Sequence, residues 1–240
     1  MACGAVHPIR GLKHLGGEPE PGFERRDTRG ATALRHVMPD RRLRSTITDN
    51  LCRAHQWSAA YSRGQNPWWR AGVVAWLVYV SARHSVDPAY VSPFYWLNLP
   101  IHEAGHFIFS LQPWTFLAVA AGTLFQLLAP VAAAVNFIRQ RDYFALTVCG
   151  VWLATNLFYI AWYMADARSQ IHPGYRPFGI DADIHDWNYM LSAVGMLSWD
   201  RALSHVVTGL AITCTWASVL VGVYLVALMF RHAFAPRATT

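Results

Sequence analysis

The sequence predicts an all-α, polytopic membrane helical bundle of about five transmembrane helices with a disordered, basic N-terminal segment. Of the 240 residues, 54% are hydrophobic and only 14% are charged, whereas about a quarter of the residues in soluble domains are charged. Long apolar runs follow residue 66, and only helices or closed barrels satisfy backbone polar groups in lipid. These runs are too long and continuous for barrel strands, so helices are expected.

Residues 1–66 are rich in Gly, Pro and Arg and show little periodicity, which predicts a largely disordered segment with one short helix over residues 46–61. The arginines of the chain are concentrated in and just after this segment. A basic segment before a membrane domain favours attraction to anionic lipid. Nucleic-acid binding is not expected, because basic and aromatic residues do not interleave as they do in nucleic-acid modules. Membrane lipid is therefore the first expected partner.

Five apolar runs define the expected membrane helices, in residues 68–82, 90–111, 114–138, 143–165 and 206–230. The third run, for example, exceeds the roughly 20 residues that a helix needs to cross a bilayer. We therefore expect a multi-pass integral membrane domain over residues 67–232, followed by a tail over residues 233–240.

The second run contains the motif His102-Glu103-Ala104-Gly105-His106. On a helix this spacing places two imidazoles one turn apart on the same face, where both can bind one Zn²⁺. Glu103 is also the only glutamate after Glu24. An ionisable side chain kept within a membrane segment is a functional candidate, and Glu103 is placed to hold and deprotonate a water at the metal. The sequence therefore predicts a zinc site with ligands His102 and His106 and the base Glu103.

The start of the motif helix has two interpretations. Either Asn98 is the N-cap and Pro100 lies in the first turn, or Pro100 kinks a longer helix. In both cases the two histidines share a face.

A catalytic zinc keeps three protein ligands and one open position, so a third ligand is expected downstream. Asp186 is the first choice, because Trp187 and the residues after it indicate a membrane-dipping helix for which Asp186 would be the N-cap. His185 is the alternative third ligand. The full set of downstream candidates is Asp166, His172, Asp181, Asp183, His185, Asp186 and Asp200.

Taken together, these motifs resemble the site-2 protease family of intramembrane zinc metalloproteases: HEAGH in an apolar helix, a glycine-containing segment from Gly122 to Gln126, and an aspartate before a later membrane-embedded segment. The resemblance covers roughly residues 95–190. It implies that His102 and His106 bind zinc, that Glu103 is the base, and that Asp186 corresponds to the aspartate of the family's Leu-Asp-Gly motif, which reads His-Asp-Trp here.

The function that follows is a zinc-dependent intramembrane endopeptidase acting on a transmembrane or juxtamembrane peptide substrate. The alternatives are a non-proteolytic membrane protein with a metal site (a scaffold, sensor or transport component) and a proton or ion path lined by the motif.

Four further polar residues have expected roles. Gln126 and Asn156 are candidates for substrate-backbone or oxyanion hydrogen bonds, with hydrogen bonding between helices as the alternative. Asp166 and Arg168 are expected to form an interfacial ion pair.

Overall fold

The computed structural model describes residues 41–171 and 185–235, and side chains from residue 47 onward. The chain divides into two compact units, residues 1–57 and 58–240, and the features below belong to the second. Residues 1–40 of the segment expected to be disordered, and residues 236–240 of the expected tail, lie outside the described residues. The short helix expected over residues 46–61 lies within α1 (Arg41–Ser62).

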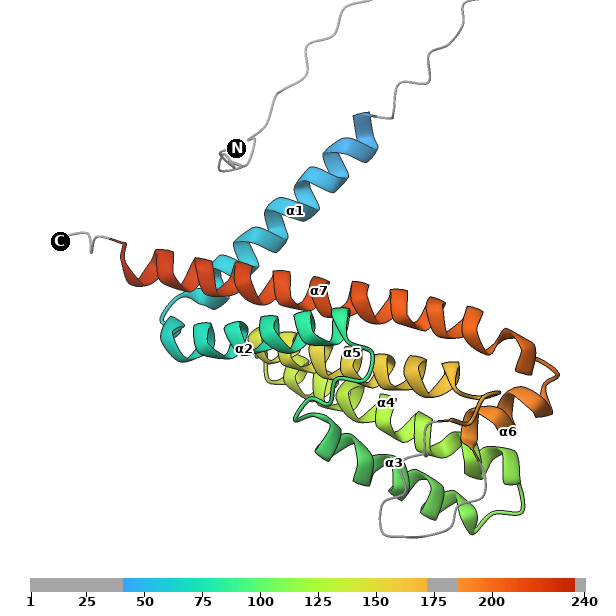
Figure 1. Cartoon of the computed structure of the whole chain (residues 1–240). Coiled ribbons are helices and arrows are strands. Elements are labelled where there is room, and N and C mark those ends of the chain that lie inside the picture. Colours follow the sequence, from blue (N-terminus) through green and yellow to red (C-terminus); the bar gives the residue numbers. More distant parts are fainter. Residues whose placement is uncertain (1–40, 172–184, 236–240) are drawn as a thin grey trace, which may run out of the picture. The chain divides into compact units, whose positions relative to one another are not determined.

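The described part of the chain is helical, as predicted, and contains no strand (Figure 1). After α1, the elements are α2 (Pro67–Val86), α3 (Tyr95–Ser110), α4 (Thr115–Arg139), α5 (Tyr143–Ala165), α6 (Asp186–Ala193), the short 3₁₀ helix η2 (Leu197–Trp199) and α7 (Asp200–Ala233).

Within the described residues, three helical segments are long and apolar enough to cross a membrane: α4, α5 and Leu197–Ala233. The first two of the five expected runs form α2 and α3. With 16 residues, α3 is about 24 Å long, shorter than the roughly 30 Å hydrocarbon core. The 20 residues of α2 include Arg70, Arg83 and His84. By length and composition the structure therefore has three candidate spans where the sequence predicted about five.

The central helix of the second unit is α5. The helices are layered in the order α7, α5, α4, α3, and α2 packs against α7 and α5 (Figure 1). One core cluster joins three helices through the buried side chains of Leu77, Val80, Val151 and Val219. The close packing of these side chains holds α2 and α7 against α5, and van der Waals packing of this kind is what associates helices in lipid.

A close contact between α3 and α4 positions the HEAGH motif. Gly105 faces the α4 backbone so closely that a Cβ atom there would lie 2.4 Å from the carbonyl oxygen of Ala121. The motif glycine therefore permits an approach of two helices that any larger residue would prevent.

Of the two interpretations of the motif helix, the structure has the longer helix, with Pro100 inside it. The first residue of α3 is Tyr95, so Pro100 lies inside the helix and Asn98 is not the N-cap. Instead, the Asn98 Oδ1 atom accepts a hydrogen bond from the Trp152 indole N–H at 2.6 Å, which ties α3 to α5.

The short helix α6 covers the end of the bundle where α4 begins and α5 ends (Figure 1). Its Leu191 side chain packs on Ile160, Met164 and Ala167. The side-chain amide of Asn188 also donates to the Ala167 carbonyl at 2.7 Å. These contacts bring the chain after residue 185 back to the HEAGH motif.

Candidate metal centre

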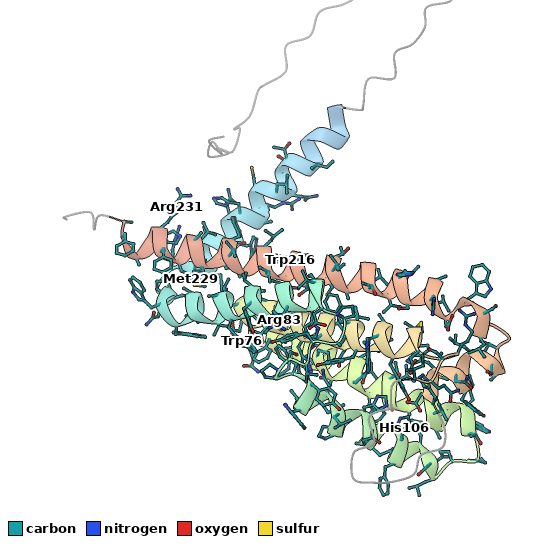
Figure 2. All side chains as sticks on the ribbon, in the orientation of Figure 1. Trp76, Arg83, His106, Trp216, Met229 and Arg231 are labelled. Atoms are coloured by element: carbon teal, nitrogen blue, oxygen red, sulfur yellow. The ribbon has the colours of Figure 1, made fainter. Side chains whose placement is uncertain are left out.

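Three side chains from two helices converge at one point. His102 and His106 lie one turn apart on α3, with their Nε2 atoms 2.9 Å apart. Asp186, the first residue of α6, places its Oδ2 atom 3.2 Å from each of these nitrogens. Figure 2 labels His106 in this group. No other group of described His, Cys, Asp or Glu residues has an arrangement suited to a metal ion.

The other nitrogen of each ring is already used. The His106 Nδ1 atom lies 2.9 Å from the carbonyl oxygen of Ala118. Because a carbonyl can only accept, this nitrogen carries a proton, so Nε2 is the nitrogen that the neutral ring would present to a cation. The His102 Nδ1 atom lies 3.0 Å from the Gln126 Oε1 atom, which orients that ring in the same way. The two Nε2 atoms and the Asp186 carboxylate oxygen therefore converge on one position, where neutral rings could bind a cation and protonated Nε2 atoms donate to the carboxylate instead.

The distances between these three atoms suit a tetrahedral zinc. With bonds of about 2.0–2.1 Å, tetrahedral ligand atoms lie about 3.3 Å apart, close to the 2.9 and 3.2 Å found here. The His106 side chain is 26% exposed, so the group is not completely enclosed by protein. Three side-chain donors is the number found in catalytic zinc sites, whereas closed structural sites use four.

Asp186 is held in its charged form. Burial raises the pKa of this carboxyl, but hydrogen bonds and charge interactions with His102 and His106 outweigh burial and lower the pKa to about 2. Asp186 is therefore an anion at neutral pH, as a metal ligand must be.

The face of α4 against the imidazoles has no side chain at its centre. A Cβ atom on Gly122 would lie 2.4 Å from the His106 Nε2 atom and 2.7 Å from the His102 Nε2 atom. Ala118, Gly122 and Gln126 are spaced four residues apart and therefore share one face of α4. The first and last of these residues bind the ring Nδ1 atoms, while the glycine leaves room for the Nε2 atoms.

Glu103 follows His102 on α3, between the two histidines of the group. Its side chain is partly buried, and no described residue hydrogen-bonds to its carboxylate. Although burial opposes the shift, the negative charge of Glu103 is one of the smaller causes that raise the pKa of His106.

Of the expected third ligands, the structure brings Asp186 to the histidines and not His185. The imidazole of His185 is the N-cap of α6, in place of the expected Asp186, because its Nδ1 atom accepts from the Asn188 backbone N–H at 3.2 Å. Burial lowers the pKa of His185, against the raising effect of the Asp166 and Asp186 charges, so the ring is neutral at pH 7.

Among the described candidates, Asp166 and Asp200 are not part of the group formed by His102, His106 and Asp186. His172, Asp181 and Asp183 lie outside the described residues. The expected ion pair between Asp166 and Arg168 is wrong, because Arg168 binds Asp200 at 2.7 Å.

Gln126 and Asn156 both have partners within the protein. Gln126 accepts from His102, as described above. Asn156 is completely buried and donates to the Gln126 backbone carbonyl at 2.7 Å. These contacts orient the His102 ring and join α5 to α4, as the alternative of hydrogen bonding between helices predicted. The Asn156 Oδ1 atom has no hydrogen-bond partner among the described residues, and a role for either amide toward a substrate stays a prediction.

Sequence reasoning did not identify the roles of Ala118 and Tyr163. The spacing of Ala118, Gly122 and Gln126 on one helix face is a signal that could have identified the first. Nothing near Tyr163 in the sequence predicts that its hydroxyl accepts from the Asp186 backbone N–H, at 3.4 Å.

Comparison of the chain with protein-family models, with curated proteins and with solved structures finds no match.

Proposed function

We propose that this protein is a zinc-dependent intramembrane endopeptidase that hydrolyses peptide bonds of membrane-embedded substrates. The observation that carries the proposal is the convergence of two imidazole nitrogens and one carboxylate oxygen within 3.2 Å of one another, with Glu103 beside them. The set of two nitrogens and one oxygen suits zinc, and HExxH on a helix is the arrangement in which zinc peptidases use it.

The roles of the residues follow from their positions. His102, His106 and Asp186 would hold the ion, and Gln126 and the Ala118 carbonyl would keep the rings oriented. When bound, zinc supplies a Lewis acid for the scissile carbonyl and lowers the pKa of a water to about 7. Glu103 would accept the proton of the attacking water and pass it to the leaving amine.

The position of the site along α4 and α5 indicates where a substrate would be cut. Gly122 is seven residues from the start of the 25-residue helix α4, a depth of about 10 Å. Tyr163, next to Asp186, is two residues from the end of α5. Trp114, largely exposed, and the Arg168–Asp200 ion pair mark the same end. The proposed substrate is therefore a peptide bond near one membrane interface, reached by local unwinding of the substrate helix.

To test the proposal, the full chain is reconstituted in liposomes together with a panel of single-span substrates, and the depth at which each substrate is cleaved is determined. We expect cleavage about 10 Å from one interface, loss of cleavage when a chelator removes the metal, and recovery on adding Zn²⁺. His205→Ala, on an exposed histidine of α7 outside the metal group, is the matched control and should cleave like the wild type.

Two results would contradict the proposal. Cleavage that persists after the metal has been removed would exclude metal catalysis. A zinc-loaded protein that cleaves no member of the panel would favour the non-proteolytic alternative, a membrane protein with a metal site.

A further inference from the structure

Of the three residues proposed to bind the metal, Asp186 lies on the shortest helix and at its first residue. His102 and His106 belong to a helix of 16 residues, whereas Asp186 is the first residue of a helix of eight. Packing of Leu191 holds the body of α6 on α5. The direction in which Asp186 points depends instead on the residues at the start of α6.

His185, immediately before Asp186, is fixed on three sides. Its Nδ1 atom accepts from the Asn188 N–H, as described above. Its ring stacks on Tyr163 with the centroids 4.1 Å apart, and the Tyr163 hydroxyl in turn accepts from the Asp186 backbone N–H. Its Nε2 atom is buried and lies 4.0 Å from the Oδ2 atom of Asp166.

The tautomer of His185 makes this last contact attractive. Because the Nδ1 atom is an acceptor, the proton of the neutral ring is on Nε2. That buried N–H dipole faces a carboxylate at a distance of electrostatic contact, longer than a hydrogen bond. The charge of Asp166 therefore favours the observed orientation of the His185 ring.

Asp166 has a position that links two distant parts of the chain. It is the C-cap of α5 and is only 4% exposed. Its Oδ1 atom accepts from the Ser169 hydroxyl at 2.7 Å and from the Ile171 backbone N–H at 3.0 Å, while its Oδ2 atom faces His185. One carboxylate thus contacts the chain where it leaves α5 and again where it enters α6.

We propose that Asp166 is a positioning residue for the metal centre: through His185 it holds the start of α6 so that Asp186 completes the ligand set. The inference rests on the metal site of the proposed function, and not on proteolysis. Desolvation of a carboxylate is costly, which agrees with a specific role for a group this deeply buried.

The test is the dissociation constant for Zn²⁺ of the full chain in detergent, measured by competition with a chromophoric chelator. Asp166→Asn keeps the size of the side chain and an oxygen for Ser169 and Ile171, but removes the charge facing His185. We expect binding about 10–100-fold weaker, the range for partners that orient metal ligands. With Co²⁺ as a probe, the visible spectrum of Asp166→Asn should shift toward that of Asp186→Ala.

Asp200→Asn is the matched control. Asp200 is also a buried carboxylate at this end of the bundle, 1% exposed and bound to Arg168, but it does not contact α6 through any described hydrogen bond or ion pair. This variant should lose thermal stability and keep its zinc dissociation constant within about twofold of the wild-type value. Equal weakening in both aspartate variants would reduce Asp166 to a general structural role and overturn the proposal.

A second variant tests whether Asp166 acts on Asp186 through His185, or whether Asp166→Asn merely disturbs the residues around position 166. Asn is a favourable N-cap, so His185→Asn preserves the start of α6 while removing the ring that faces Asp166. We expect His185→Asn to weaken zinc binding, and the double variant to be little weaker than either single one, because the two residues act through each other. Additive losses, or wild-type affinity in Asp166→Asn, would overturn the proposal.

The outcomes distinguish this inference from the proposed function. A protein that binds zinc, shows the expected losses and cleaves no substrate would retain Asp166 as a positioning residue and contradict the peptidase. A protein that cleaves substrates, but whose Asp166→Asn variant binds zinc normally, would support the peptidase and contradict the positioning role of Asp166.

Discussion

Gly122→Ala should abolish metal binding while leaving the fold intact. The added Cβ atom would lie 2.4 Å from one ligand nitrogen and 2.7 Å from the other, closer than non-bonded atoms approach. Both atoms belong to side chains, so the imidazoles can rotate away without movement of the backbone. The cost is the loss of the ligand geometry, and we expect less than about a tenth of an equivalent of zinc per chain, since structural and catalytic zinc require all of their protein ligands in place.

The expected loss of zinc from Gly122→Ala is opposite in direction to the effect of helix propensity, which favours alanine. The experiment therefore separates contact with the imidazoles from a general effect on the helix. Alanine is about 1 kcal/mol more favourable than glycine inside a helix, so a glycine without nearby atoms should tolerate the change. At Gly72 and Gly209 an added Cβ atom would meet no other atom within 4 Å, and Gly72→Ala and Gly209→Ala are the controls. Zinc content and thermal unfolding are measured together. A Gly122→Ala protein with a full equivalent of zinc would show that α4 does not pack against the imidazoles as described.

Glu103→Gln should abolish peptide cleavage and keep the metal. Gln has the size of Glu and leaves His102, His106 and Asp186 unchanged, but it cannot accept a proton at neutral pH. General acid–base catalysis contributes about 10²–10⁴-fold, so the rate constant for cleavage should fall by at least that factor while zinc content stays at the wild-type level.

The control for this substitution is Asp87→Asn, which removes a carboxylate that pairs with Arg83 on an exposed face of α2. It should leave both zinc content and cleavage unchanged. Undiminished cleavage by Glu103→Gln would remove Glu103 from its proposed role, and loss of zinc in that variant would make it a structural part of the centre.

The convergence of His102 and His106 could be predicted from sequence because both histidines belong to one helix. A spacing of four residues determines that two side chains share a face, whatever surrounds that helix. The third ligand depends on the tertiary structure. His185 and Asp186 are adjacent in sequence, and the choice between them rests on the imidazole of His185 being used to cap α6.

Partners distant in sequence were the least predictable. Arg168 has an acidic residue two positions earlier, yet it binds Asp200, 32 residues further along the chain. Asp200 reaches Arg168 because the chain returns through α6 to the end of α5. Residue spacing near Arg168 does not reveal this return. Likewise, the contact of Gly122 with both imidazoles depends on how α3 crosses α4.

The helical architecture was predictable because apolar runs reveal helices directly, but the number of candidate spans was not. The run over residues 90–111 is interrupted by Pro93 and Pro100, and the helix within it has only 16 residues. This helix packs on α4 and carries the HEAGH motif, although it is shorter than the roughly 30 Å hydrocarbon core of a bilayer.

The most direct test of the central claim is the zinc content of the purified full chain, measured by mass spectrometry for the wild type and four variants. The account predicts about one equivalent in the wild type and in His205→Ala, and less than about a tenth in His102→Ala, His106→Ala and Asp186→Ala, because zinc needs all three protein ligands. A wild-type protein without zinc after expression in zinc-supplemented medium, or a full equivalent in Asp186→Ala, would contradict it.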